Sequence, residues 1–289
     1  MQRIFVGDVQ GCAAELEALI ERAEAKFGPD FTLWVVGDLV NRGPQNLRAL
    51  EIVRERVEAG RAEYVLGNHE IFLISVALGL RGLRPSDSIG DVLESADASD
   101  WIDWLRARPL VVPGEIDGQR FAMLHAAADP DWSLAELVGV SEAISERLAG
   151  SATVAREFLA SDPTPGSARD HLGRLTRCRS VTADGGWSSD EPAAPEFAWH
   201  AAWARRRHDY GIVYGHWSRQ GLHFAPGLRG LDTGCVHHGR GRDGFLTAWL
   251  PDTSDAGTRR TRAFELPDER IWQVPARRRY YDPEARAAR

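Results

Sequence analysis

Three polar residues that could bind a metal or a phosphate occur at regular intervals in the first quarter of the chain. Asp8, Asp38 and Asn68 each follow a glycine at the end of an apolar stretch, and they lie thirty residues apart. Carboxylate and amide oxygens are hard ligands that suit divalent cations. Such glycine pairs are also common in ordinary turns, but three at one spacing favour a metal or phosphate site.

The same spacing predicts the elements that position these side chains. Short apolar segments alternate with segments whose apolar residues recur at helical spacing, which is typical of a βαβαβ unit. The predicted strands are 3–6, 32–36 and 63–66, and the predicted helices are 13–27 and 47–57. Strands joined by such crossovers are parallel, and open α/β sheets build their sites where the carboxyl ends of the strands meet. The three polar side chains should therefore lie at one edge of the sheet.

Asp38 is the central residue of this hypothesis. It lies at the end of the apolar run that includes Val35 and Val36. A carboxylate buried alone at that position would be costly to desolvate, so we expect a cation partner. A metal is the partner that we favour, and we expect Asp38 to bridge two of them.

Composition sets limits without naming a ligand. The chain has 289 residues, 43% of them hydrophobic, which is enough for a large core in one or two domains. The net charge of −7 argues against a general nucleic-acid binder. Cys12, Cys178 and Cys235 show no Cys-x-x-Cys spacing, which fits a reducing compartment. The longest apolar run, 71–80, is too short to span a membrane and the N-terminus lacks a leader pattern, so we expect a soluble cytoplasmic protein without a membrane partner.

Three segments carry a resemblance to a known family. The segments 7–11, 37–43 and 67–70 (GDVQG, GDLVNRG and GNHE) resemble the signature blocks of the metallophosphoesterases, and more narrowly those of the phosphoprotein-phosphatase branch. Within that branch the chain most resembles the bacterial symmetrical bis(5'-nucleosyl)-tetraphosphatases, which are diadenosine tetraphosphatases. The further matching pieces are Cys12, 32–34, 104–106, 109–110, 124–126, 215–217 and 231–235. The resemblance covers most of residues 1–275 and is weak from about 140 to 205.

This resemblance implies a fold and a reaction. The fold is α/β, the metallophosphoesterase fold, with two packed mixed β-sheets flanked by helices and a helical cap. We expect a single domain over 1–289, a cap element over 71–108 and a helical insertion over 133–170. The implied reaction is hydrolysis of diadenosine tetraphosphate to two ADP by a hydroxide that bridges two metals. Removal of nucleoside-tetraphosphate caps from RNA would cleave the same bond, and the sequence does not distinguish the two substrates.

Carried over residue by residue, the resemblance also implies two divalent metal ions that share Asp38. The first ion would be held by Asp8, Gln10 and Asp38, and the second by Asp38, Asn68, His125 and His216. Both histidines close a strand-like segment, but they are candidates mainly through the family. Oxygen and imidazole ligands suit Mn2+, Co2+ or Mg2+, and we expect Mn2+.

Two positions depart from the family pattern. Gln10 stands where many relatives have histidine, so the first metal should bind less tightly and favour harder ions. His237 and His238 follow Gly234-Cys235, where relatives usually have a tryptophan. We interpret this pair as a loop feature, and an additional metal ligand is the alternative.

Asn41 bears on the choice of substrate. Protein phosphatases of this branch have aspartate there, paired with the general acid that corresponds to His69. Asparagine can orient an imidazole but cannot stabilise its positive charge, so His69 should be a weaker proton donor. A nucleoside diphosphate, whose terminal phosphate has a last pKa of about 6, leaves more easily than a serine alkoxide. Asn41 therefore favours phosphoanhydride cleavage.

Arginines complete the expected machinery. Arg42 should bind the nonbridging oxygens of the attacked phosphate and neutralise the charge that develops there. The segment 175–179 resembles the one that supplies a second arginine in the family. We favour Arg177 for this role, with Arg179 as the alternate.

Two alternative functions would use the same residues. A Ser/Thr protein phosphatase would employ the same metals, although Asn41 counts against it. A catalytically weak nucleotide-binding regulatory protein would result if Gln10 had cost the chain its first metal. The sequence does not predict the oligomeric state.

Overall fold

Two β-sheets lie at the centre of the protein, whose computed structural model describes residues 1–251, 264 and 270–280. The first sheet has the strand order β12-β13-β1-β2-β3, with β14 also paired to β13. Its strands are β1 (Gln2–Val6), β2 (Phe31–Val35), β3 (Ala62–Tyr64), β12 (Asp232–Thr233), β13 (Phe245–Trp249) and β14 (Ile271–Pro275). The pairs β1-β2 and β2-β3 are parallel, which confirms the predicted βαβαβ unit.

The second sheet has the order β10-β11-β9-β5-β4. Its strands are β4 (Val111–Ile116), β5 (Gln119–Leu124), β9 (Tyr210–Tyr214), β10 (His223–Ala225) and β11 (Leu228–Gly230). Parallel and antiparallel pairs occur in both sheets, so both are mixed, as expected. A small separate sheet joins β6 (Ser180–Val181), β7 (Trp187–Ser188) and β8 (Phe197–Ala198).

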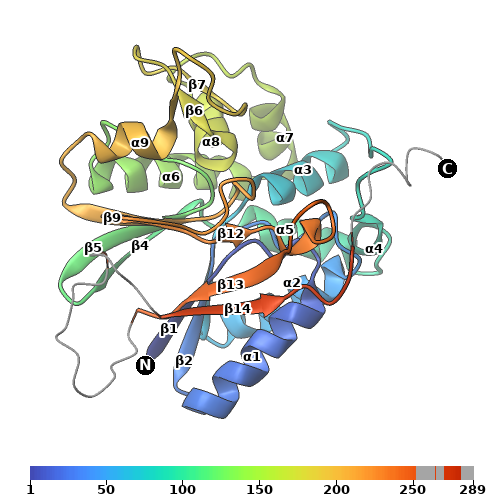
Figure 1. Ribbon diagram of the computed structural model, residues 1–289. Helices are drawn as coiled ribbons and strands as arrows, with labels where there is room; N and C mark the ends of the chain where they lie inside the picture. Colours follow the sequence, from blue (N-terminus) through green and yellow to red (C-terminus); the bar gives the residue numbers. More distant parts are fainter. Residues whose placement is uncertain (252–263, 265–269, 281–289) are drawn as a thin grey trace, which may run out of the picture.

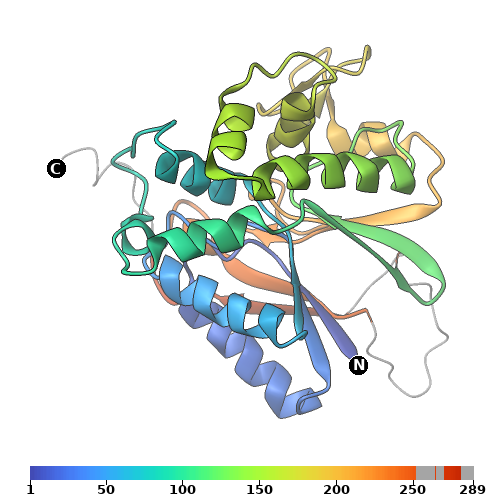
Figure 2. The same cartoon turned by 180° about the vertical axis from the view of Figure 1, so that it is seen from behind.

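Helices cover the outer faces of the two sheets. They are α1 (Ala13–Phe27), α2 (Asn46–Glu58), α3 (Asn68–Ala77), α4 (Gly90–Leu93), α5 (Ala98–Arg106), α6 (Leu134–Ala149), α7 (Ala152–Ala160), α8 (Ala168–Arg177) and α9 (Trp199–Ala204). Helices α1 and α2 lie below the first sheet, and α6 to α9 lie above the second (Figure 1). The same order of helices, sheet, sheet and helices is visible from behind (Figure 2). The expected arrangement of two packed mixed sheets flanked by helices is therefore confirmed.

The two sheets pack through aromatic side chains. Phe5 of β1 lies with its ring centre 5.4 Å from Phe121 of β5 and 5.3 Å from Trp249 of β13. Its neighbours Ile4 and Val6 belong to the larger core that includes the apolar faces of α1 and α2. Alternate residues of a strand point to opposite faces, so this buried strand presents one face to the second sheet and the other to the helices.

Two predicted segments have helical content. Segment 71–108 contains most of α3, all of α4 and all of α5, and segment 133–170 contains α6, α7 and the start of α8. The interpretation of the first as a cap and of the second as an insertion stays a prediction. Among the described helices, none is long and apolar enough to cross a membrane.

Candidate active site

The six candidate metal ligands meet where strands of both sheets end. Asp8 and Gln10 follow β1, Asp38 follows β2, Asn68 begins α3, His125 follows β5 and His216 follows β9. Asp38 is central, because its Oδ1 atom lies 3.4 Å from His125 Nε2 and its Oδ2 atom lies 3.5 Å from Gln10 Nε2. Asp8 joins the group by accepting a hydrogen bond of 3.1 Å from the backbone N–H of His216. The structure thus brings all six side chains into one cluster.

Glycines are required beside these ligands because the ligands pack against the backbone. A Cβ atom on Gly67 would overlap the carboxylate of Asp38, and one on Gly215 would overlap the carboxylate of Asp8. A Cβ atom on Gly37 would lie 2.8 Å from His125 Nδ1. Gly37, Gly67 and Gly215 therefore have a reason beyond turn formation, since each makes room for a ligand from another part of the chain.

The backbone is also strained at this site. Five of the six described non-glycine residues with positive φ are predicted site residues: Gln10 (47°), Asp38 (49°), Asn41 (75°), Arg42 (72°) and His216 (69°). L-residues seldom adopt this region, and it persists only where surrounding contacts impose it. The fold therefore holds these side chains in positions that their local preferences would not select.

Glu70 is a site residue that the sequence analysis missed. Its fully buried carboxylate accepts hydrogen bonds from the backbone N–H groups of Asp38 (2.9 Å), Leu39 (2.8 Å) and Gly67 (2.7 Å). It thereby ties the loop after β2 to the start of α3, which carries Asn68. A signal was present, because a glutamate three residues after the residue that precedes a helix often accepts from the backbone N–H of that residue, as Glu70 does from Gly67.

Buried carboxylates crowd the site. Burial raises the pKa of Asp8, and the charges of Asp232 and Asp38 raise it further. Burial likewise raises the pKa of Glu70 to about 7 and that of Asp232 to about 6. Burial alone would raise the pKa of Asp38 too, but the neighbouring His125 and His69 outweigh it, so the pKa is lowered. Divalent cations would relieve this concentration of negative charge.

The donor atoms around Asn68 also fit a cation. Side-chain donor atoms of Asp38, His125 and His216 lie within 4.8 Å of one another. The Asn68 side-chain oxygen lies 3.3 Å from His125 Nε2, and the same amide atom lies 2.8 Å from His216 Nδ1. If the Asn68 amide were rotated by 180°, its NH2 group would donate hydrogen bonds to the ring nitrogens of His125 and His216. A cation bound between the amide oxygen and the two ring nitrogens would satisfy the same lone pairs. Burial lowers the pKa of His216 well below its usual value, which keeps the imidazole neutral as metal binding requires.

Comparison with known proteins identifies the family. A family model for calcineurin-like phosphoesterases matches residues 1–217. The chain belongs to the calcineurin-like phosphoesterase family. The family and the hydrolase class expected from the sequence are thereby confirmed.

Relatives of this phosphoesterase extend over most of its length. The symmetrical bis(5'-nucleosyl)-tetraphosphatase of Janthinobacterium sp. (strain Marseille) is 36% identical over 258 residues, covering 83% of this chain and 91% of the relative. The protein of the same name from Chromobacterium violaceum is 34% identical over 252 residues, covering 81% and 88%. A crystal structure of a provisionally assigned diadenosine tetraphosphatase superposes with a TM-score of 0.61 at 24% identity, covering 95% of this chain and 93% of that one, and supports the fold.

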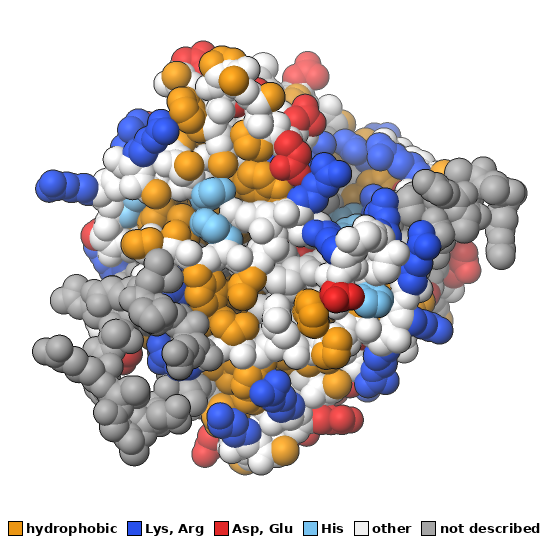
Figure 3. Space-filling view, in the orientation of Figure 1, with side chains coloured by type: hydrophobic (Ala, Val, Ile, Leu, Met, Phe, Trp, Pro, Cys, Tyr) orange, Lys and Arg blue, Asp and Glu red, His pale blue; other side chains and the backbone are white. Residues whose placement is uncertain are grey.

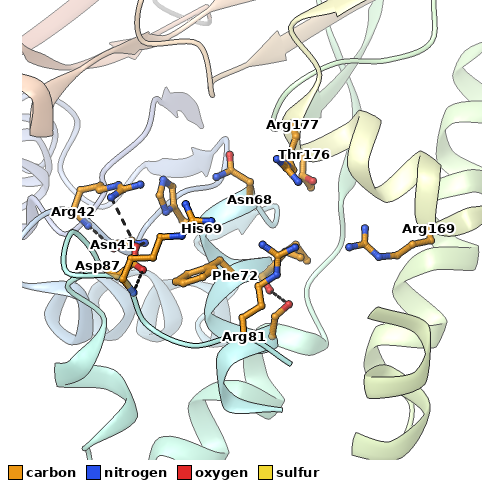
Figure 4. A pocket seen from close by; sticks show the side chains of 13 residues that line it. Asn41, Arg42, Asn68, His69, Phe72, Arg81, Asp87, Arg169, Thr176 and Arg177 are labelled. Carbon is orange, nitrogen blue, oxygen red and sulfur yellow. Dashed lines mark hydrogen bonds and ion pairs between the residues drawn. The ribbon is translucent and has the colours of Figure 1, made fainter. Parts of the chain in front are cut away.

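The surroundings of His69, the predicted general acid, differ from the expectation that Asn41 orients this histidine. Asn41 Nδ2 instead donates to Asp87 Oδ1 at 3.1 Å (Figure 4). Asn41 Oδ1 accepts from the backbone N–H of Ser88 at 3.0 Å. Among the described residues, His69 Nδ1 has no hydrogen-bond partner, and His69 Nε2 lies 3.8 Å from Asp38 Oδ2. The expected contact is absent because the loop at 86–88 supplies Asn41 with other partners.

The two candidate second arginines of the phosphoesterase face different clefts. Arg177 lines a cavity of about 160 Å3 together with Arg42, Asn68 and His69. Arg179 lines a neighbouring cleft, and its Nη1 atom donates to the Ser189 carbonyl at 2.5 Å. Arg42 itself is oriented by Ser86, whose hydroxyl accepts from Arg42 Nη1 at 2.8 Å. The position of Arg177 therefore suits contact with a phosphate that also meets Arg42.

The two histidines after Cys235 lie outside the ligand cluster. His238 Nδ1 accepts a hydrogen bond of 3.2 Å from the backbone N–H of Gly244, a contact within the loop. His237 lines the same cleft as Arg179, and burial lowers its pKa to about 3. Neither is among the described side chains whose donor atoms group with Asp38, which is consistent with interpreting the pair as a loop feature.

Proposed function

We propose that the protein hydrolyses diadenosine tetraphosphate to two ADP with the help of two divalent metal ions. One observation carries the proposal: Asn68 of the ligand cluster and the adjacent His69 line a cavity whose lining also includes five arginines. A chain of phosphates is the anion that such a cavity suits. The names of the relatives that cover more than four fifths of the chain support the same substrate.

The metal ions would be held by the cluster described above. Asp8, Gln10 and Asp38 would hold the first, and Asp38, Asn68, His125 and His216 the second. When bound, the ions would supply positive charge and lower the pKa of a water near the attacked phosphorus. The mixture of oxygen and imidazole ligands supports Mn2+ as the preferred ion.

The remaining steps belong to side chains of the chain itself. Arg42 and Arg177 would bind nonbridging oxygens of the attacked phosphate, which orients it and offsets the charge that develops. His69 would donate a proton or a hydrogen bond to the departing ADP. Because ADP is an easy leaving group, a histidine without a carboxylate at position 41 is sufficient for this role.

The identity of the products tests this proposal. With Mn2+ present, chromatography of a diadenosine tetraphosphate digest should show ADP as the only product. Formation of AMP and ATP in equal amounts would contradict symmetrical cleavage, and absence of turnover with any of Mn2+, Co2+ and Mg2+ would contradict the whole proposal.

The same site would also act on RNA that carries a nucleoside-tetraphosphate cap, since the bond to be broken is identical. The exposed position of Arg177 supports this extension, because a longer substrate could leave the cavity on that side. A capped RNA that releases no ADP under conditions where the dinucleotide is cleaved would exclude decapping.

The three cysteines are free and buried, which supports a reducing compartment and thus a cytoplasmic reaction.

A further inference from the structure

Three arginines of the cavity are not used by the proposed reaction. Arg81 and Arg84 come from the segment between α3 and α4, and Arg169 comes from the first turn of α8. They line the same cavity as Arg42 and Arg177, so guanidinium groups from three separate segments converge there. Figure 4 shows Arg169 reaching from its helix toward Arg81, and Figure 3 shows basic side chains gathered over α3 and the loops beside it.

Negative charge in the cavity is scarce. Asp87 is the only carboxylate among the described residues that line it, and this side chain already accepts from Asn41 Nδ2 and from the backbone N–H of Arg84. Among the described residues, the side chains of Arg81, Arg84 and Arg169 form no ion pair with a carboxylate. Guanidinium groups gathered in this way repel one another, and an anion between them would be strongly favoured.

The mutual effects of the charges agree with this arrangement. Burial lowers the pKa of Arg169, and the charges of Arg81 and Arg177 lower it further. The pKa of Arg177 is lowered by burial and then by Arg81, Arg179 and Arg84. Arg81 is therefore close enough to influence both Arg169 and Arg177 electrostatically, in agreement with their common position in the cavity lining.

A neighbouring cleft, compared with the cavity lined by Arg42 and Arg177, shows why a polyanion should bind in that cavity. That cleft also contains arginines, among them Arg179 and Arg242, but Asp190 and Glu191 line it with them. Among the described lining residues, that cleft has four arginines against two carboxylates, whereas the first cavity has five arginines against one aspartate. A polyanion would prefer the first cavity.

We propose that Arg81, Arg84 and Arg169 form a subsite for the phosphates of the leaving half of the substrate. A single phosphate ester would occupy only the position between Arg42 and Arg177. The guanidinium groups of the three other arginines would then have no phosphate to bind. A substrate with two phosphates beyond the attacked one would place those phosphates against the three arginines. The subsite would therefore select substrates by the number of phosphates on the leaving side, which rests on the proposed polyphosphate hydrolysis.

The test is the selectivity of a variant in which Arg81, Arg84 and Arg169 are all changed to glutamine. The measured quantity is kcat/KM for diadenosine tetraphosphate divided by kcat/KM for p-nitrophenyl phosphate, with Mn2+. We expect this ratio to fall by about 30-fold or more, since even one lost charge-assisted contact can cost about tenfold in affinity. A matched control changes three exposed arginines outside the cavity, Arg61, Arg207 and Arg219, to glutamine, and its ratio should stay at the wild-type value. An unchanged ratio in the first variant, or an equal fall in the control, would overturn the inference.

A second measurement separates this inference from the proposed function. Calorimetry on the full-length protein in the presence of a chelator compares binding of tripolyphosphate with binding of orthophosphate, so that no turnover is needed. We expect tripolyphosphate to bind at least about tenfold more tightly, and the triple variant to lose that advantage. If the wild-type protein shows this preference but cleaves no diadenosine tetraphosphate, the subsite stands and the proposed function fails. If tripolyphosphate has no advantage over orthophosphate, the subsite is refuted whatever the enzyme cleaves.

Discussion

The metal-ligand cluster and the arginine-lined cavity lie next to each other but are built in opposite ways. In the cluster, Asp38 and His125 are buried and are fixed by backbone contacts. In the cavity wall, Arg81, Arg84 and Arg177 are exposed and belong to a loop and to the end of a helix. The difference indicates that the position of the chemistry is set by the folding of the whole domain, whereas selection of the substrate rests on side chains that can change without refolding.

The largest expected effect comes from removing space inside the cluster. Gly67→Ala would place a methyl group on the Asp38 carboxylate and should lower kcat by about 100-fold or more, since a displacement of about 1 Å can cost that much. Binding of Mn2+, measured by calorimetry, should weaken in parallel. Gly82→Ala is the matched control, because nothing lies within 4 Å of its added Cβ. A Gly67→Ala variant with activity within about threefold of the control would show that the cluster tolerates a displaced carboxylate and is not held rigidly by the fold.

Loss of the Glu70 contacts should have the next largest effect. Glu70→Gln leaves one acceptor oxygen where the carboxylate now accepts from several N–H groups, and the new NH2 group would face donors. We expect unfolding free energy to fall by about 2 kcal/mol and kcat/KM to fall about tenfold. Denaturant unfolding and steady-state kinetics would measure these effects, with the exposed Glu146→Gln as control. Stability equal to that of the control would mean that Glu70 does not hold the loop.

The contact between Asn41 and Asp87 gives a smaller, paired effect at the border of the two regions. Asn41→Asp alone would set a carboxylate against Asp87, so turnover of diadenosine tetraphosphate should fall by about tenfold. Combining it with Asp87→Asn should restore turnover to within about threefold and should raise activity on a phosphoserine peptide. Kinetics of the two single variants and the double variant would measure the coupling. Losses that simply add would show that the two side chains act independently.

Much of the cluster could be predicted from the sequence because it follows a regular pattern. Asp8, Asp38 and Asn68 each close a strand of one parallel unit, so their meeting follows from topology. His125 and His216 follow strands of the second sheet, and mainly the family resemblance joined them to the ligands at the first. Contacts that depend on loop conformation could not be predicted, and Asp87 is the example: it reaches Asn41 across 46 positions of sequence, from a loop without a periodic pattern.

The arginines of the cavity could not be predicted from the sequence for a similar reason. The chain is rich in arginine, and nothing in the spacing of Arg81, Arg84 and Arg169 predicts that these three meet in one cavity. Their convergence requires the packing of α3 and α8 around one cavity, which is a property of the whole domain. A cluster at strand ends is visible as a pattern, whereas a cavity wall assembled from distant segments becomes visible only in three dimensions.

The central claim is that a fixed metal cluster is combined with walls selective for polyphosphate. The most direct test is the ratio of kcat/KM for diadenosine tetraphosphate to kcat/KM for a phosphoserine peptide, measured on the wild-type protein with Mn2+. We predict a ratio of at least about 100, equivalent to about 2.7 kcal/mol of preferential transition-state binding. A ratio near or below one would contradict the account and would favour a protein phosphatase.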